Sequence, residues 1–317
     1  MKKLAILGAG AFGTSLAISF SKKADVFLFS AFQDHVERMN AARENEFLLG
    51  FKIPNSIQIR NTETINNNEF DCVLWTFPVA PTKTLLYSLK DMIDGTDVVI
   101  CSKGLQSDGT LLSDLFKSLL PKSKIGYLSG ANFAHEIASG LQTLSDITFD
   151  DINIADCFAK TFSNDTFKLI PGSDLIGVQI ASAFKNIMAI ASGILFGINA
   201  GQNAHAAFLT IALNEIKEIG VKLGAKENTF YGHSGLGDLI LTTSSDLSRN
   251  TSIGIKLAKG EKIEDILTKS NHVCEGIETI KHAICLAKQY GMQLKVTEML
   301  HRIIFQNADP QTIMNIC

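Results

Sequence analysis

The sequence lacks the features that mark several classes of protein. Its 317 residues carry 29 basic and 32 acidic side chains, so a formal net charge of −3 provides no strong field to gather nucleic acid or an anionic membrane. The six cysteines form no CxxC pair and have no histidine at zinc-ligand spacing, so we expect no metal site. No apolar run reaches the roughly 20 residues that span a bilayer, and no leader precedes the first apolar run. We therefore expect a cytoplasmic protein with reduced thiols, no nucleic-acid partner and no membrane insertion.

Short apolar runs alternate with helical patterns in the first half, which is typical of βαβ units with a mostly parallel sheet. Strands are predicted at residues 4–8, 26–29, 72–76, 98–102 and 124–129. Helical spacing of apolar residues then recurs over 176–191, 206–223, 263–267, 277–290 and 297–305. No proline lies between Pro171 and Pro310, so the second half is predicted to be all helix, with a hinge at Pro171-Gly172-Ser173. The sequence thus predicts an α/β domain over residues 1–173 and an all-α domain over residues 174–317.

A glycine-rich turn follows the first predicted strand. Gly8, Gly10 and Gly13 form a GxGxxG motif that opens an apolar-periodic helix near Ala11 and Phe12. In such motifs the first glycine makes a tight turn, the second admits a pyrophosphate and the third packs helix on strand, while free N–H groups at the helix start bind the diphosphate. The motif in this context predicts a Rossmann-type dinucleotide-binding domain. A merely glycine-rich turn is the alternative.

The residues that would select NAD or NADP are not visible. NAD-selective folds carry an acid about 20 residues beyond the motif, whereas the second strand here ends in Phe29-Ser30-Ala31. No arginine follows at once to clamp a 2′-phosphate. The prediction is therefore NAD or NADP, with the choice open.

Two more turns follow predicted strands, at the edge where ligands of open α/β sheets bind. Lys103 follows the strand at 98–102 and would place an ammonium there, although a solvated surface lysine is the alternative. Gly130 and Asn132 lie in a small-residue turn that ends the strand at 124–129 and starts a helix. Taken alone, Asn132 is better explained as a helix N-cap than as a ligand.

Lys185 lies in a helical stretch, residues 181–187, that is otherwise mostly small and apolar. Burying a lysine is costly unless it is paired or used. Desolvation lowers a lysine pKa toward neutrality, the range in which it serves as a general acid or base. The alternative is a side chain whose stem reaches solvent.

A polar segment completes the set of candidates. The glycines of residues 232–238 predict a loop between helices, and Ser248, Arg249 and Asn250 follow after several further hydroxyls. A guanidinium fork with neighbouring hydroxyls suits a phosphate. A polar loop with helix caps is the alternative.

Together these motifs resemble the bacterial NAD(P)-dependent glycerol-3-phosphate dehydrogenases. The resemblance covers nearly the whole chain and rests on GAGAFGTSLA (8–17), KG (103–104), SGANFA (129–134), AFKN (183–186), GINAGQNAHAA (197–207), TFYGHSGLGDL (229–239), SRN (248–250) and VCEG (273–276). It implies reduction of dihydroxyacetone phosphate to sn-glycerol 3-phosphate, a phospholipid precursor, with NADH or NADPH. It also implies a Rossmann-type domain followed by a helical domain like that of 6-phosphogluconate dehydrogenase.

The resemblance implies roles for individual residues. Lys185 aligns with the catalytic lysine that exchanges a proton with the C2 oxygen, and an ion pair with Asp238 would set its proton affinity. Substrate contacts are implied for Lys103, Gly130, Asn132, Lys185, Asp238, Ser248, Arg249 and Asn250. Cofactor contacts are implied for Gly8, Gly10, Ala11, Phe12, Gly13, Lys103, Ala134, Arg249, Val273 and Glu275.

The chain departs from the family pattern in three places. Ala131-Asn132 replaces the Pro-Ser or Pro-Thr of many bacterial members, and Ile211 replaces a usual arginine. Ala31 stands where arginine or histidine is frequent, which weakens the expectation of NADPH preference. A related two-domain hydroxyacid or phosphogluconate dehydrogenase is the alternative function, and a non-catalytic nucleotide sensor is a more distant one. The oligomeric state stays open between a monomer and a homodimer.

Overall fold

The chain forms two compact units. The computed structural model describes residues 2–66, 69–245, 248–268 and 274–316. Met1–Ser102 and Leu112–Leu175 make the first unit, and Lys103–Leu111 with Ile176–Cys317 make the second. The main division falls between Leu175 and Ile176, close to the expected boundary. The segment Lys103–Leu111 belongs to the second unit, whereas the sequence prediction had placed it in the first.

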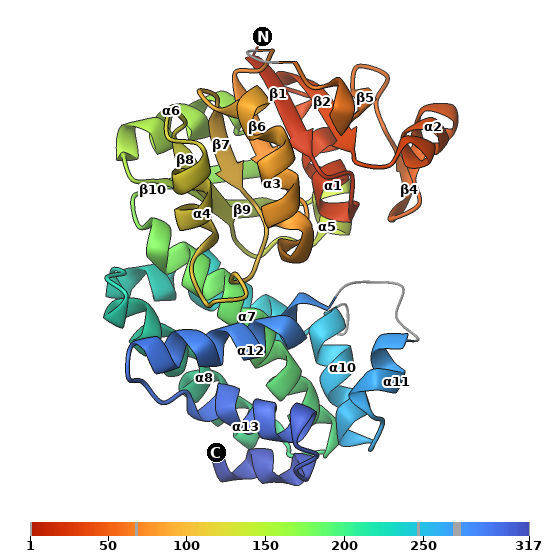
Figure 1. The fold of residues 1–317 in the computed structure, drawn as a ribbon. Helices are drawn as coiled ribbons and strands as arrows, with labels where there is room; N and C mark the ends of the chain where they lie inside the picture. Colours follow the sequence, from red (N-terminus) through yellow and green to blue (C-terminus); the bar gives the residue numbers. More distant parts are fainter. Residues whose placement is uncertain (1, 67–68, 246–247, 269–273, 317) are drawn as a thin grey trace. The chain divides into compact units, whose positions relative to one another are not determined.

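An eight-stranded sheet forms the centre of the first unit (Figure 1). Its order is β10-β9-β8-β7-β6-β1-β2-β5, and every pair is parallel except β8 with β9. The strands are β1 (Lys2–Leu7), β2 (Ala24–Ser30), β5 (Gln58–Asn61), β6 (Cys72–Trp75), β7 (Asp97–Ile100), β8 (Ile125–Ser129), β9 (Thr143–Phe149) and β10 (Phe167–Gly172). All five predicted strands are confirmed. Pro171 and Gly172, expected to form a hinge, lie instead in β10, an edge strand that tolerates a proline.

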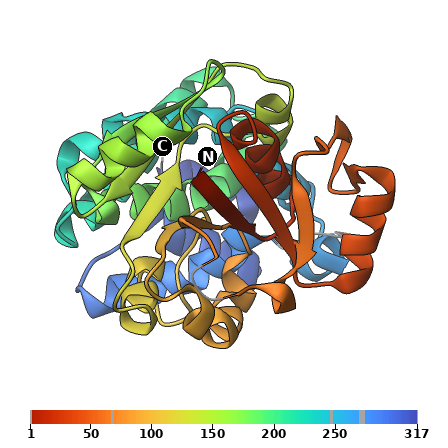
Figure 2. The ribbon, with the colours of Figure 1, turned by 90° about the horizontal axis from the view of Figure 1, so that it is seen from above.

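Helices cover both faces of this sheet. They are α1 (Ala11–Phe20), α2 (Gln33–Ala42), α3 (Val79–Ile93), α4 (Leu112–Leu119), α5 (Ala134–Ala138) and α6 (Ile152–Phe162), and a hairpin of β3 (Glu44–Asn45) and β4 (Leu48–Lys52) follows α2. Figure 2 shows α1 with α5 and α6 on one face and α3 with α4 on the other. The strand order reverses between β1 and β6, and the right-handed crossovers that parallel strands generally adopt then place helices on both faces. Ligands of open α/β sheets bind at the carboxyl ends of the strands at such a reversal.

The second unit is helical throughout its described elements. Its α-helices are α7 (Leu175–Gly197), α8 (Gln202–Lys222), α9 (Asp238–Thr243), α10 (Arg249–Ala258), α11 (Ile263–Thr268), α12 (Glu275–Gln289) and α13 (Lys295–Phe305). The five predicted helices are therefore confirmed. In length and composition α7 would suffice to cross a membrane, but 89% of its apolar window is buried inside the protein. It is thus the core helix of this unit (Figure 1).

Glycines let α7 and α10 pack closely. A Cβ on Gly193 would lie 2.1 Å from the carbonyl oxygen of Thr251, and one on Gly254 would lie 2.1 Å from that of Ile190. Both distances are far below van der Waals contact, so larger side chains at these positions would force the helices apart. The crossing fixes the start of α10, where Arg249 lies, relative to the helix that carries Lys185.

The glycine-rich segment at 232–238 differs from its prediction as a loop. His233–Gly237 forms a short π-helical turn (η3) that continues directly into α9. A Cβ on Gly235 would lie 2.2 Å from the carbonyl oxygen of Phe230, so this glycine permits a backbone approach that other residues would block. The prediction of a loop was wrong because glycine serves here for close packing inside a helical turn.

Candidate active site

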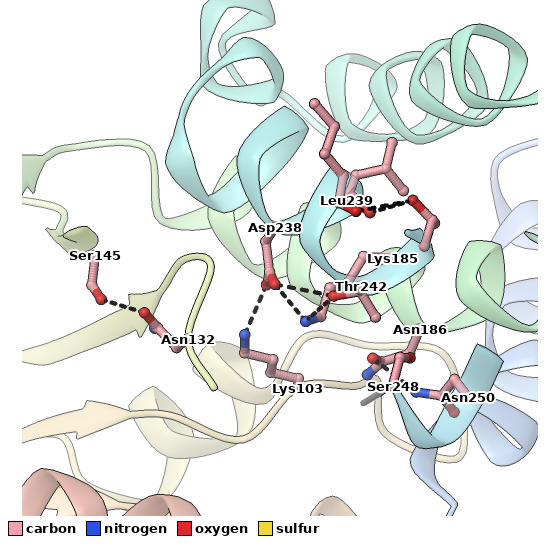
Figure 3. A network of polar contacts seen from close by, with 12 residues as sticks. Lys103, Asn132, Ser145, Lys185, Asn186, Asp238, Leu239, Thr242, Ser248 and Asn250 are labelled. Atoms are coloured by element: carbon pink, nitrogen blue, oxygen red, sulfur yellow. Dashed lines mark hydrogen bonds and ion pairs between the residues drawn. The ribbon is translucent and has the colours of Figure 1, made fainter. Parts of the chain in front are cut away.

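A network of charged side chains lies within the second unit (Figure 3). The ammonium of Lys185 donates to Asp238 Oδ1 at 2.6 Å, and that of Lys103 donates to Asp238 Oδ2 at 2.8 Å. Lys185 also donates to Thr242 Oγ1 at 2.8 Å, and that hydroxyl donates to Asp238 Oδ1 at 3.3 Å. The expected ion pair between Lys185 and Asp238 is therefore present, and one carboxylate holds two lysines.

Three different elements supply these side chains. Lys185 lies in the middle of α7, while Asp238 and Thr242 lie one helical turn apart on α9, so their side chains share a face. Lys103 comes from the segment Lys103–Leu111, whose Leu105 and Leu111 join the apolar core of the second unit. The network is consequently complete within one unit.

Contacts with α12 hold the segment that carries Lys103. His282 Nδ1 lies 3.0 Å from the Leu105 carbonyl oxygen, and Gln289 Nε2 donates to the Asp108 carbonyl oxygen at 2.8 Å. Gly109 has φ +86°, and a Cβ there would lie 2.8 Å from the Leu286 nitrogen. The side chain of Lys103 therefore projects from a backbone fixed on a helix, which favours a constant geometry toward Asp238.

Burial sets the electrostatics of the network. Asp238 is fully buried and Lys185 is 8% exposed. Desolvation lowers the pKa of Lys185 to about 8, since the attraction of Asp238 only partly offsets burial and Lys103 adds repulsion. Burial raises the pKa of Asp238, but the ammonium groups of Lys103 and Lys185 more than offset this and hold that pKa below its ordinary value. Near neutral pH the site therefore holds an anion between two cations, one of which titrates in the working range of a general acid.

The hydrogen bonds leave Lys185 with a donor to spare. Among the described side chains, Asp238 and Thr242 accept two of the three N–H groups of its ammonium. The third is available to a substrate oxygen. The alternative of a side chain whose stem reaches solvent does not describe Lys185, because its ammonium is paired inside the protein.

The Ser248-Arg249-Asn250 segment begins α10. Ser248 is the N-cap, and its side chain accepts from the Thr251 backbone N–H, so this residue caps the helix whether or not it also contacts a ligand. Arg249 is exposed in the first turn. Asn250 Nδ2 donates to Asn186 Oδ1 at 3.1 Å, which links the segment to the residue that follows Lys185. The segment thus combines an accessible guanidinium with an amide tied to α7.

The glycine motif has the geometry expected of a dinucleotide site. Gly8 has φ +120°, and a Cβ on Gly13 would lie 2.1 Å from the Gly8 carbonyl oxygen, so both positions require glycine. Nothing lies within 4 Å of a Cβ built on Gly10, which leaves the space a pyrophosphate needs. The first turn of α1, which includes Ala11 and Phe12, contains no acidic residue to repel a diphosphate. These residues fit NAD or NADP.

The end of β2 presents neither charge that would select a cofactor. Ser30 Oγ lies 3.1 Å from Nδ1 of the buried His35 and accepts from the Phe32 backbone N–H. This hydroxyl serves the local turn, and Ala31 has no polar group to offer. Neither of the two positions after Phe29 carries a carboxylate or a guanidinium, so the end of β2 offers no charged group to distinguish NAD from NADP.

The turn after β8 corrects the interpretation of Asn132 as a helix cap. The N-cap of α5 is Phe133, with no side-chain cap bond, and α5 itself begins at Ala134. Asn132 Oδ1 instead accepts from Ser145 Oγ at 2.8 Å. Gly130 has φ +153°, and a Cβ there would lie 2.9 Å from the Leu144 carbonyl oxygen, so the turn lies directly on β9.

The remaining candidate residues belong to the helical part of the chain. Glu275 is the first residue of α12 and is partly exposed, and Val273 lies outside the described residues. Ile211, where the family usually has arginine, is partly buried against the apolar core of the second unit. Sequence reasoning missed two side chains: Thr242, treated only as one of several hydroxyls, and Ser145. The four-residue spacing of Asp238 and Thr242 would have revealed the first had the segment been predicted as helix.

Comparisons with known proteins show the family to which the chain belongs. The family models described as the NAD-dependent glycerol-3-phosphate dehydrogenase N-terminus and C-terminus match residues 3–155 and 174–315. The glycerol-3-phosphate dehydrogenase (NAD(P)+) of Syntrophotalea carbinolica is 36% identical over 97% of this chain and 95% of its own length. That of Francisella philomiragia is 36% identical over 99% and 96%. The crystal structure of glycerol-3-phosphate dehydrogenase from Coxiella burnetii matches 99% of this chain and 98% of its own, with 29% identity and a TM-score of 0.94. This chain therefore belongs to the NAD-dependent glycerol-3-phosphate dehydrogenase family.

Proposed function

We propose that this protein reduces dihydroxyacetone phosphate to sn-glycerol 3-phosphate with NADH or NADPH, reversibly, and so supplies glycerophospholipid synthesis. The observation that carries the proposal is the network in which Asp238 holds both Lys185 and Lys103. A ketone reduction needs a proton donor and a cation for the developing alkoxide, and two ammonium groups fixed on one carboxylate can supply both. Family membership gives the substrate.

Lys185 is the proton donor in this account. When bound, the nicotinamide cofactor supplies the hydride to the carbonyl carbon. Lys185 gives the proton of its third N–H to the C2 oxygen, and its amine takes that proton back in the reverse direction. Asp238 and Thr242 accept the other two hydrogen bonds of the ammonium, and they thereby fix its orientation and favour its charged form. Lys103, held at Asp238 Oδ2, stabilises the negative charge that develops on the same oxygen.

We assign recognition of the substrate phosphate to the start of α10. Arg249 offers a guanidinium fork, while Ser248 and Asn250 add a hydroxyl and an amide. The phosphate does not change in the reaction, so its binding serves to orient the ketone. Gly130 and Asn132 contribute the remaining substrate contacts.

Cofactor binding is assigned chiefly to the first unit. Gly8, Gly10 and Gly13 with the N–H groups of Ala11 and Phe12 hold the diphosphate. Ala134, Lys103, Arg249 and Glu275 are assigned the further cofactor contacts that the family pattern gives them, as is Val273. We therefore assign dinucleotide binding chiefly to residues 1–173 and substrate binding chiefly to residues 174–317.

The cytoplasm is the proposed compartment. Cys72, Cys101, Cys157, Cys274 and Cys285 are free thiols, which suits a reducing environment. A homodimer is the assembly we propose to look for, and light scattering on the purified protein distinguishes it from a monomer.

Oxidation of NADH and NADPH by the purified protein tests the proposed function. Dihydroxyacetone phosphate is supplied beside a panel of 2-oxo acids, and the product is identified by its stereochemistry. We expect turnover with dihydroxyacetone phosphate and formation of the sn-3 isomer. Turnover confined to an oxo acid would identify a hydroxyacid dehydrogenase, and cofactor binding without any turnover would indicate a sensor.

A further inference from the structure

Two buried polar side-chain atoms of the first unit, Asn132 Nδ2 and Thr148 Oγ1, have no hydrogen-bond partner among the described residues, and only the first belongs to a residue that the proposed function uses. Asn132 Nδ2 is buried and makes no hydrogen bond to the described residues, although Oδ1 of the same amide accepts from Ser145 Oγ at 2.8 Å (Figure 3). Unpaired buried N–H groups are rare because the lost hydration is not replaced. The unpaired N–H groups of this amide therefore indicate that a bound ligand supplies the missing hydrogen-bond acceptor.

Ser145 is held rigidly by the sheet. It is fully buried on β9, where it pairs with Leu169 of β10, and its neighbour Asp146 pairs with Ser129 of β8. A Cβ on Gly130 would lie 3.0 Å from the Ser145 Cα, so the turn that carries Asn132 sits on this strand. The hydrogen bond from Ser145 to Asn132 thus joins two fixed backbone segments.

This hydrogen bond decides which end of the amide is directed away from β9. An asparagine amide has an acceptor oxygen at one end and two N–H donors at the other. Because the Ser145 hydroxyl donates to Oδ1, the oxygen is occupied and the N–H groups are turned away from β9. Without that donor, rotation by half a turn about the last side-chain bond would present the oxygen instead.

The proposed function leaves one substrate oxygen for this donor. Lys185 and Lys103 serve the C2 oxygen, and the start of α10 is assigned the phosphate. The free terminal hydroxyl of dihydroxyacetone phosphate remains. We propose that Ser145 is a positioning residue that aims the Asn132 N–H at this hydroxyl and thereby makes the enzyme select substrates that carry it. The inference rests on the proposed function and extends it to specificity.

A substrate without the hydroxyl should react poorly. Hydroxyacetone phosphate keeps the ketone and the phosphate but has a methyl group in place of the terminal hydroxymethyl group. Bound in the same way, it leaves the Asn132 N–H unpaired, and sites built to bond a hydroxyl reject analogues that lack it. The ratio of kcat/KM for dihydroxyacetone phosphate to kcat/KM for hydroxyacetone phosphate therefore reports on the orientation of the amide.

The test compares this ratio in four proteins. Ser145→Ala should lower the ratio about tenfold relative to wild type, the effect of one lost hydrogen bond. Ser145→Thr keeps a hydroxyl and should retain most of the ratio. Thr148→Val is the matched control, since it removes from the same strand a buried hydroxyl that has no described hydrogen-bond partner. It should leave the ratio unchanged.

A second pair of variants separates positioning from a general effect of packing. In an Asn132→Ala background, the further change Ser145→Ala should leave the ratio where Asn132→Ala alone has put it. An unchanged ratio in Ser145→Ala, or a further fall in the double variant, would overturn the inference while leaving the proposed function intact. Failure of the wild-type protein to reduce dihydroxyacetone phosphate would overturn both.

Discussion

Replacing Asp238 with asparagine removes the charge that holds both lysines while keeping the size of the side chain. Asp238 is fully buried, with Lys185 Nζ 2.6 Å from one oxygen and Lys103 Nζ 2.8 Å from the other. Without the carboxylate, the Lys185 ammonium keeps its desolvation cost and the repulsion of Lys103. Its pKa must therefore fall below the value of about 8 that it has with Asp238 present.

The size of this effect follows from the charge separation. Opposite charges about 4 Å apart attract by about 4 kcal/mol at an effective dielectric constant of about 20, and each 1.36 kcal/mol is a tenfold change in proton affinity. Both lysine side chains keep some exposure, 10% for Lys185 and 15% for Lys103, so water recovers part of the loss. We expect the high-pH inflection of kcat/KM for reduction to move to lower pH by at least about one pH unit.

The assay is NADH oxidation with dihydroxyacetone phosphate over a range of pH, for wild type and Asp238→Asn. Asp265→Asn, which removes an exposed carboxylate from α11, controls for a loss of negative charge elsewhere in the same unit. Denaturant unfolding should show a loss of about 3 kcal/mol in Asp238→Asn, because buried ammonium groups are left without their partner. An inflection that stays in place while activity falls would refute the electrostatic reasoning.

Three other predictions concern the chemistry, the phosphate and the cofactor. Lys185→Ala should lose at least about 100-fold in turnover while cofactor binding persists, as measured by kinetics and by titration of NADH fluorescence, and near-normal turnover would exclude the proposed proton donor. Arg249→Gln should lower kcat/KM for dihydroxyacetone phosphate about 30-fold or more, but it should lower kcat/KM for dihydroxyacetone, which has no phosphate, far less. Equal losses for the two substrates, or a rise in the cofactor dissociation constant that explains the whole loss, would refute the phosphate role. NADH and NADPH should both serve, because neither Ser30 nor Ala31 offers a charge to the ribose; a preference of about 1000-fold in kcat/KM would reveal another selecting residue.

The sequence predicted the parts of the fold that local patterns specify. Strands β1, β2, β6, β7 and β8 are buried on both faces and appear as short apolar runs, so they were recognised. Strands β5, β9 and β10 were missed. β9 carries polar residues and β10 contains Pro171, which only an edge position tolerates. Such strands depend on sheet pairing rather than on their own composition.

The sequence predicted which residues belong to the candidate site better than it predicted how they pair with one another. The ion pair of Lys185 with Asp238 could be expected, because a buried lysine needs a partner. The attachment of Lys103 to the same carboxylate could not, because it depends on Lys103–Leu111 packing with the second unit. The helical turn at 233–237 was not predicted for a related reason. Glycine locally favours a loop, whereas Gly235 here allows a close backbone contact with Phe230 that only the folded structure reveals.

The pH dependence of wild-type kcat/KM in both directions tests most directly the claim that Lys185 moves the proton. With a pKa of about 8, Lys185 is an ammonium below this pH and an amine above it. Reduction needs the ammonium, so its kcat/KM should be level at lower pH and fall above about pH 8. Oxidation of sn-glycerol 3-phosphate needs the amine, so its kcat/KM should rise toward about pH 8 and then level off. Mirror-image limbs that meet near pH 8 would support the account, whereas limbs that fall on the same side, or no inflection near pH 8 in either direction, would contradict it.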